Sequence, residues 1–309
     1  MSELIEVADG LAFPEGPIAM PDGSVVLVEM FGPRLTRVLP DGSKETIAEI
    51  PGGPNGAALG PDGLVFVCNN GGRFTMTDMD GLVFPGPLTM ANYIGGRIQT
   101  VDPATGAVED LYTECDGRPL LAPNDLVFDA HGGFYFTDHG LVDDEERIHR
   151  LSGIYYAKAD GSSIKEVVFP TDDPNGIGLS PDGTKLYWAE TWRGRILQRD
   201  VVAPGELAAP GLVDTSQCLY GFPGFQLLDS LAVDSAGNVC VATIVNGGVS
   251  VVSPDGELVD FVETGDLITT NVCFGGPDLT TAYVTLSTTG RLVTTQWPRP
   301  GLPLEYLNR

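Results

Sequence analysis

Residues 173–183, DPNGIGLSPDG, show the pattern on which the chain is built. A polar side chain, Asn175, precedes a short apolar run, and the turn residue Asp182 lies seven positions further on. A second apolar run, KLYWAE, follows the turn, and two such runs joined by a turn are typical of a β-hairpin. The same arrangement occurs six times, with Glu15, Asn55, Asn124, Asn175, Asp229 and Asn271 as the polar residues.

The six repeats predict the fold. They begin about 40 to 70 residues apart, which leaves room for about four strands in each and is the size of a propeller blade. We therefore predict an all-β chain that forms a six-bladed β-propeller as a single domain over residues 1–309. The last repeat is short of a strand, and the N-terminal sequence LIEVADG is expected to complete that blade and close the ring.

Two segments exceed a plain blade. They are residues 70–96 and 216–228, and both are rich in Gly, Pro and aromatic residues. Because long loops with aromatic side chains are often functional, we expect them to form a lid or a wall over one end of the axis. The alternative is that they pack into small cores of their own. The aromatic residues concerned are Phe84, Tyr93, Tyr220, Phe222 and Phe225.

Composition narrows the class of protein. The net charge of −25, from 17 basic and 42 acidic residues, argues against nucleic acid or an anionic membrane as a partner. No apolar run approaches the length of a membrane span, and the N-terminus lacks the pattern of a signal peptide. The five cysteines are scattered without a CxxC pair, which favours buried, reduced thiols in a cytoplasmic protein.

The polar residue of each repeat is a candidate for chemistry. The innermost strands of a propeller line its channel, so side chains at the start of these strands converge. Glu15, Asn124, Asn175 and Asp229 would bring together two carboxylates and two amide oxygens, which suits calcium, magnesium or manganese. Alternatively, these residues cap the strands and bond to backbone, as Asn and Asp often do at turns. Spacing alone leaves both interpretations open.

Four motifs extend this interpretation. FPEGP, PNDLVFD, PNGIGLSPDG and DSLAVD resemble, in order and separation, the motifs of the senescence-marker-protein/gluconolactonase family of six-bladed propellers, to which diisopropylfluorophosphatase is related. The resemblance implies that Glu15, Asn175 and Asp229 bind a divalent metal, commonly calcium or zinc. Asn124 matches a fourth position that some members use on the metal and others on the substrate. It also implies hydrolysis of a small-molecule lactone.

The expected mechanism is polarisation of the lactone carbonyl by the metal, with Asp229 activating water or attacking directly. The alternatives are phosphotriester hydrolysis at the same metal and a non-catalytic, calcium-stabilised propeller that binds a partner. A third alternative is condensation or lyase chemistry, as in strictosidine-synthase-like propellers. It is disfavoured because these propellers generally lack the full set of four polar residues. We expect substrate contacts from Asn55, Asn124, Asn271, Asp138, His139, Tyr220 and Phe222.

A second set of polar residues follows each axial residue by about fourteen positions. It consists of Glu29, Asn69, Asp138 and Glu190, near the ends of the second strands. His139, in FTDHG, replaces the proline of the family's FTDP-type segment and is a candidate general acid or base, although a strand-end histidine is often simply solvated. His131 and His149 are expected at the surface. Ala122 stands where animal lactonases have an arginine, so the sugar contact of the family is not carried over. The aromatic segments favour a less polar or a larger substrate.

Overall fold

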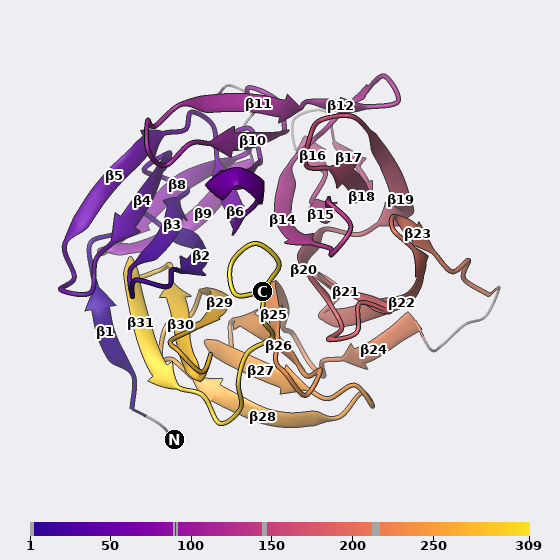
Figure 1. Ribbon diagram of the computed structural model, residues 1–309. Coiled ribbons are helices and arrows are strands. Elements are labelled where there is room, and N and C mark those ends of the chain that lie inside the picture. The colour runs from indigo at the N-terminus through magenta and orange to yellow at the C-terminus, as the bar shows by residue number, and fades with distance from the viewer. Residues whose placement is uncertain (1–2, 89, 91, 144–146, 212–216) are drawn as a thin grey trace.

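The computed structural model describes residues 3–88, 90, 92–143, 147–211 and 217–309. Six antiparallel sheets surround a central axis, so the fold is the predicted six-bladed propeller (Figure 1). Each sheet runs from an inner strand at the axis to an outer strand at the rim.

The first three blades contain, from the axis outward, β2 (Pro14–Ala19), β3 (Val25–Glu29), β4 (Arg34–Val38) and β5 (Lys44–Glu49); β6 (Pro54–Leu59), β7 (Val65–Asn69), β10 (Arg97–Val101) and β11 (Val108–Tyr112); and β14 (Pro123–Phe128), β15 (Gly133–Asp138), β18 (Ser152–Lys158) and β19 (Ile164–Thr171).

The last three blades contain β20 (Pro174–Leu179), β21 (Lys185–Glu190), β22 (Arg195–Ala203) and β24 (Cys218–Gly221); β25 (Leu227–Val233), β26 (Val239–Ile244), β27 (Gly248–Val252) and β28 (Leu258–Glu263); and β29 (Thr269–Gly275), β30 (Thr281–Leu286), β31 (Arg291–Gln296) and β1 (Ile5–Ala8). Short additional elements are the 3-10 turn η1 (Pro61–Gly63), β23 (Glu206–Leu207) on β22, and the hairpins β8 (Phe74–Met79) with β9 (Leu82–Leu88), β12 (Glu114–Cys115) with β13 (Arg118–Pro119), and β16 (Leu141–Asp143) with β17 (Ile148–Arg150).

The sixth blade closes the ring in the predicted way. Its outer strand is the N-terminal β1, which pairs antiparallel with β31 and places Ile5 opposite Thr294. This pairing covers the edge that β31 would otherwise expose.

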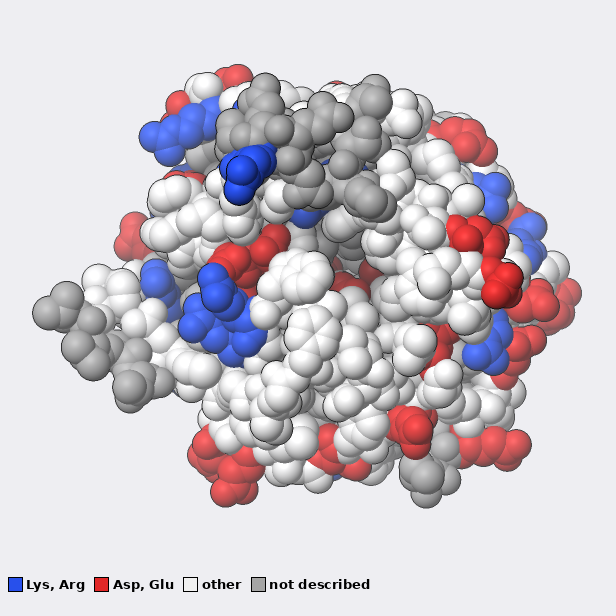
Figure 2. Space-filling model, turned by 180° about the vertical axis from the view of Figure 1, so that it is seen from behind, with Lys and Arg blue, Asp and Glu red and all other residues white. Residues whose placement is uncertain are grey.

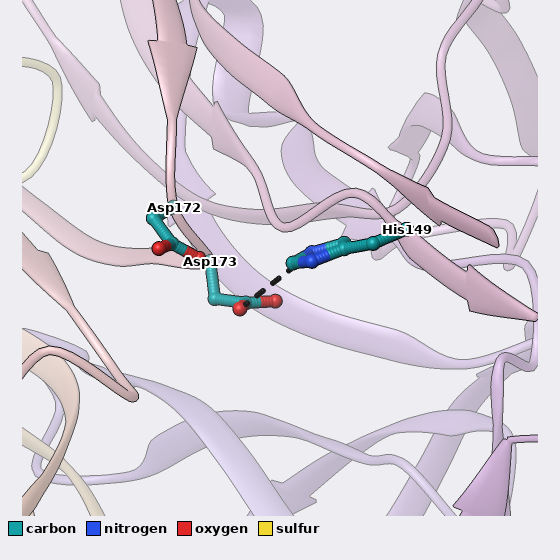
Figure 3. Close-up of side chains that lie close together, drawn as sticks. All are labelled: His149, Asp172 and Asp173. Carbon is teal, nitrogen blue, oxygen red and sulfur yellow. Dashed lines mark ion pairs between the residues drawn. The ribbon is translucent and has the colours of Figure 1, made fainter. Parts of the chain in front are cut away.

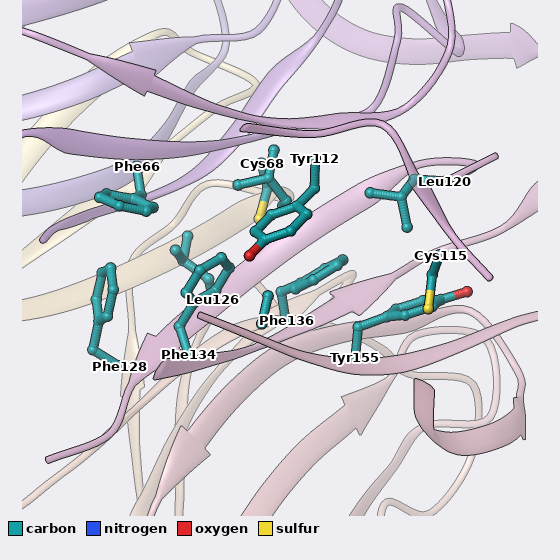
Figure 4. Close-up of a cluster of buried hydrophobic side chains, with 12 residues drawn as sticks. Phe66, Cys68, Tyr112, Cys115, Leu120, Leu126, Phe128, Phe134, Phe136 and Tyr155 are labelled. Atoms are coloured by element: carbon teal, nitrogen blue, oxygen red, sulfur yellow. The ribbon is translucent and has the colours of Figure 1, made fainter. Parts of the chain in front are cut away.

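Apolar side chains pack between neighbouring blades. The cluster between the second and third blades includes Phe66 of β7 and Phe134 of β15, whose ring centroids lie 5.6 Å apart (Figure 4). Burying one such side chain stabilises a fold by about 1.5–3 kcal/mol. The apolar run after each turn is therefore what joins one blade to the next.

All five cysteines are unpaired, as predicted; four are buried, and Cys218 is exposed.

A bulge at the start of every inner strand shapes the axis. The pairing of all six inner strands with their neighbours slips in register at or just beside the axial polar residue. A bulge bends the strand locally and re-aims a side chain. The repeated bulge therefore directs the axial residues toward one point.

The two long segments differ in the structure. In segment 70–96, β8 and β9 form a hairpin that reaches the sixth blade, where the Val83 amide donates to the Thr288 carbonyl. Its aromatic residues pack near Phe13 and Ile268, at the end of the axis where the inner strands begin. The expectation of a wall at this end is met by this segment.

For segment 216–228 the structure corrects the expectation of a long loop over the axis. Part of it, Cys218–Gly221, is β24, the outer strand of the fourth blade, and not a loop. No helix among the described residues is long and apolar enough to cross a membrane.

The C-terminal tail covers the opposite end of the axis (Figure 1). The Leu302 amide donates to the Val233 carbonyl, and Tyr306 packs on Phe128 with ring centroids 5.2 Å apart. A cavity of about 450 Å³ separates this tail from the residues next to the axial ring. The face where the inner strands begin is hollowed near its middle (Figure 2).

Candidate active site

The six axial residues converge at the start of the inner strands. All are buried, from Glu15 at 2% exposed to Asp229 at 7%. Seen from this face, the molecule is hollowed near its middle, and acidic side chains are visible at the bottom of the hollow (Figure 2). The bulges described above account for this convergence, because each re-aims its axial side chain.

Glu15 is one of three acidic residues near the axis. Its Oε2 accepts hydrogen bonds from the Gly16 amide at 3.2 Å and from Asn271 Nδ2 at 3.4 Å. Burial, followed by the charges of Asp229 and Asp125, raises the pKa of Glu15 well above its ordinary value. Three carboxylates therefore meet at the axis, and among the described residues none of them forms an ion pair with Lys or Arg.

Asp229 has a similar environment. Burial above all, and also the charge of Asp125, raises the pKa of Asp229 to about 7, although the Asn175 side chain opposes this shift. Burial raises the pKa of Asp125 to about 7 as well. A bound cation would relieve the repulsion among these groups and hold them ionised.

The sequence interpretation missed Asp125. Strand residues normally alternate between faces, so the neighbour of an axial Asn is expected to point away from the axis. The bulge between Pro123 and Leu126 breaks this alternation and leaves Asp125 close enough to Glu15 and Asp229 to raise their pKa values. The sequence signal was present, because the third repeat has an acidic residue where Gly16, Gly56 and Gly176 stand in others.

Unpartnered amide oxygens complete the site. The Oδ1 atoms of Asn55, Asn124 and Asn175 are buried, and none has a hydrogen-bond partner within the described part of the chain. Asn175 Nδ2 donates to Thr191 Oγ1 at 3.2 Å, which fixes the orientation of that amide. Leaving a buried acceptor unsatisfied costs about 1–3 kcal/mol. Amide and carboxylate oxygens without sulfur or imidazole fit a hard divalent cation.

The second set of residues supports the loops that lead to the axis. Each accepts a hydrogen bond from a backbone amide that lies two or three residues before the axial residue of its own blade. The pairs are Glu29 with Ala12, Asn69 with Gly53, Asp138 with Leu121 and Ala122, and Glu190 with Asp172. The carboxylate of Asp138 also accepts from the Gly140 amide at 3.0 Å. These side chains position the axial residues from behind.

His139 lies deeper than a solvated strand end. It is 6% exposed, and its Nδ1 lies 3.3 Å from the Pro174 carbonyl oxygen. Burial, followed by the charge of Arg73, lowers the pKa of His139 well below its ordinary value, so the imidazole is neutral. His149 is exposed, as expected.

Aromatic residues lie near the axial end of the fourth blade, at its rim and in the neighbouring loops. Tyr220 and Phe222 pack edge to face at 4.8 Å, and the Phe222 amide donates to the Gly194 carbonyl in the loop after β21. Trp192 in the same loop is 59% exposed, and Phe225, just before β25, is 70% exposed. Both lie at the end of the blades where the axial residues lie, because Trp192 follows β21 and Phe225 precedes β25.

Comparison with known proteins agrees with this geometry. The family model described as "SMP-30/Gluconolactonase/LRE-like region" matches residues 13–288. The chain belongs to this family. The match spans all six inner strands, and the resemblance found in the four motifs is thereby confirmed.

Three similar proteins illustrate the relationship. A gluconolactonase of Zymomonas mobilis is 29% identical over 233 residues, which cover 72% of this chain and 58% of the relative. Lactonase drp35 of Staphylococcus saprophyticus is 30% identical over 243 residues, which cover 76% of this chain and 64% of the relative. The chain thus matches less than two thirds of the length of these relatives. The crystal structure of regucalcin, a calcium-binding protein of Agrobacterium tumefaciens, has a TM-score of 0.71 at 19% identity, over 97% of this chain and 94% of that one.

Proposed function

We propose that this protein is a metal-dependent hydrolase that opens a lactone ring at the axial site. The observation that carries the proposal is the group of buried, unpartnered amide oxygens beside buried carboxylates that have no basic partner in the described residues. The lactonase names of two relatives support the reaction class. The calcium named for the Agrobacterium regucalcin supports calcium as the metal, with zinc, magnesium and manganese as alternatives.

Glu15, Asn124, Asn175 and Asp229 would hold the cation. When bound there, it would polarise the lactone carbonyl and stabilise negative charge on its oxygen. The Asp229 carboxylate accepts a proton from the attacking water, because it is an acid rather than an amide at an axial position. The Asn271 amide holds Glu15 in place through Nδ2, while its Oδ1 accepts from the Val272 amide at 2.8 Å.

The remaining residues bind and orient the substrate. Asn55 Oδ1 is buried without a partner in the described chain, and it accepts a hydrogen bond from the substrate. Tyr220 and Phe222 form part of the apolar wall, and Asp138 acts through the amides of Leu121 and Ala122. Ala122 is 0% exposed and offers no charge at the position of the family's arginine. A lactone with an apolar substituent therefore fits this entrance better than a sugar lactone.

The test is a rate comparison over a series of lactones, from unsubstituted rings through long alkyl-substituted rings to sugar lactones, with a phosphotriester included. The wild-type protein is expected to prefer an alkyl lactone. Asp229→Asn should lower kcat by about 10²–10⁴-fold, because it removes the base. Turnover of the phosphotriester alone would replace the lactonase proposal by the alternative at the same metal, and unchanged kcat in Asp229→Asn would rule out its role as base.

A further inference from the structure

A second cluster of potential ligands lies at the channel entrance, between the third and fourth blades. It joins His139, which directly follows β15, and His149 of β17 to Asp172 and Asp173 in the connection from β19 to β20. One ligand atom from each of His149, Asp172 and Asp173 lies within 4.8 Å of the others (Figure 3). The cluster is separate in chemistry from the axial group, because it contains imidazole nitrogens.

Both imidazoles address the same carboxylate. His139 Nε2 lies 3.6 Å from Asp173 Oδ1, and His149 Nε2 lies 3.9 Å from Asp173 Oδ2. These separations are too long for hydrogen bonds. Asp173 is only 5% exposed, no N–H group of the described residues donates a hydrogen bond to its carboxylate, and the carboxyl group of Asp172 lies beside it. A bound cation would compensate the negative charge of this buried carboxylate, and the two histidines could serve as its further ligands.

The tautomer of His139 sharpens this argument. A carbonyl oxygen only accepts, so the contact of Nδ1 with the Pro174 carbonyl at 3.3 Å places the ring hydrogen on Nδ1. In the neutral ring the lone pair of Nε2 then faces Asp173, and two lone pairs oppose each other. A metal-bound histidine commonly has this arrangement, with its other ring nitrogen donating to a backbone carbonyl.

We propose that His139, His149 and Asp173, with Asp172 beside them, form a second metal site that takes zinc or another borderline transition-metal ion. Zinc bonds of about 2.0–2.2 Å place two ligands of a tetrahedral site roughly 3.3–3.5 Å apart. The separations of 3.6 and 3.9 Å are slightly wider and would tighten around the ion. The site stands beside Pro174 and Asn175, so an ion there would fasten the β16–β17 hairpin to the rim of the axial channel.

Two arginines near the cluster could compensate the negative charge of Asp172 and Asp173 in place of a metal ion. Arg73 is 3% exposed and close enough for its charge to act on Asp173, but it forms no ion pair with it within the described residues. Arg73 Nη1 instead donates to the Gly140 carbonyl at 2.6 Å. Arg193 pairs with Asp172. The arginines therefore compensate part of the negative charge, and neither of them forms an ion pair with Asp173 in the part of the chain that the structure describes.

The experiment uses Co²⁺ as a spectroscopic probe on the protein saturated with Ca²⁺. The wild-type protein should develop the visible absorption of a Co²⁺ ion bound by nitrogen and oxygen ligands, and added Zn²⁺ should abolish it. His149→Ala should weaken Co²⁺ binding by at least about tenfold, because loss even of a residue that only orients a ligand costs 10–100-fold. His149 is 43% exposed, so this variant is expected to fold.

Three further variants decide the outcome. His131→Ala removes an exposed histidine from a turn at the far end of the blade and should leave the absorption unchanged. His139→Gln should weaken binding as His149→Ala does. Glu15→Gln should lose Ca²⁺ binding and keep the Co²⁺ signal, which separates this site from the axial one. Absence of the signal in Ca²⁺-saturated wild type, its persistence in both histidine variants, or its loss in Glu15→Gln would overturn the proposal.

Discussion

Neighbouring inner strands approach each other closely at the position that follows each axial residue. At several of these positions there is no room for a side chain. A Cβ on Gly176 would lie 2.4 Å from the Leu231 amide nitrogen, and one on Gly56 would lie 2.5 Å from the Asn124 carbonyl oxygen. The backbone of Gly176 is not in the left-handed region, so the requirement there is steric alone. Glycine thus lets neighbouring blades bring their axial residues together.

Gly176→Ala should destabilise the protein by about 1–3 kcal/mol, since overpacking forces the strands apart. It should also weaken calcium binding, because Asn175 and Asp229 would move relative to each other. Denaturant unfolding and calcium titration measure the two effects. Gly221→Ala is the matched control, because nothing lies within 4 Å of its Cβ and its φ is not positive. Equal stability of the two variants would contradict the close-packing argument.

Sequence reasoning located the axial residues because they recur at one place in every repeat. It missed Asp125, since a bulge, which no local pattern announces, overrides the alternation of side chains along β14. It predicted a substrate contact for Asp138, but in the structure this carboxylate accepts hydrogen bonds from the Leu121 and Ala122 amides, because a loop from another part of the blade packs against it.

At the scale of the element, the β8–β9 hairpin forms a wall of the entrance. Phe84 packs in the cluster with Phe13 and Met30 at the start of the first blade. Phe84→Ser should raise KM for an alkyl lactone about tenfold, the effect of losing an apolar contact, and change KM for a small unsubstituted lactone little. Steady-state kinetics on the two substrates measures this difference. Met79→Ser, at the exposed end of the hairpin, should change neither value.

The first blade carries a testable pH dependence. Burial raises the pKa of Glu29, but hydrogen bonds from Arg34, Thr36 and the Ala12 amide outweigh it, so the pKa lies below its ordinary value. A depressed folded-state pKa stabilises the fold above the unfolded value of about 4.3, and this stability is lost as the pH falls through the folded value.

Glu29→Gln should therefore lower the free energy of unfolding at pH 7 and flatten its fall below pH of about 4.3. Urea unfolding at several pH values measures both effects. Glu45→Gln, at an exposed position on β5, is the control and should keep the wild-type profile. A wild-type slope in Glu29→Gln would show that another group causes the acid sensitivity.

At the scale of the whole molecule, the ring is closed by its two termini. Removing residues 1–8 should lower the midpoint of thermal unfolding, because β31 loses its partner and the sixth blade loses a strand. The exposed edge of β31 should also promote self-association. Calorimetry and light scattering measure the two effects. A truncated protein that stays monomeric at the wild-type midpoint would contradict the closure.

The repeat made the six blades predictable, because hairpin signals recur along the whole chain. The tail, residues 298–309, carries no such signal, and its place over the far end of the axis follows from contacts such as Tyr306 on Phe128. The entrance cluster was equally hidden, since His139 and Asp173 belong to different blades and meet only when these pack together.

The central claim is that lactone opening depends on a cation held by Glu15, Asn124, Asn175 and Asp229. The most direct test is the rate of lactone hydrolysis by the metal-stripped protein as calcium is added back. We predict no turnover without the metal, recovery that saturates with calcium, and no recovery in Glu15→Gln. Full turnover by the stripped wild-type protein would contradict the claim.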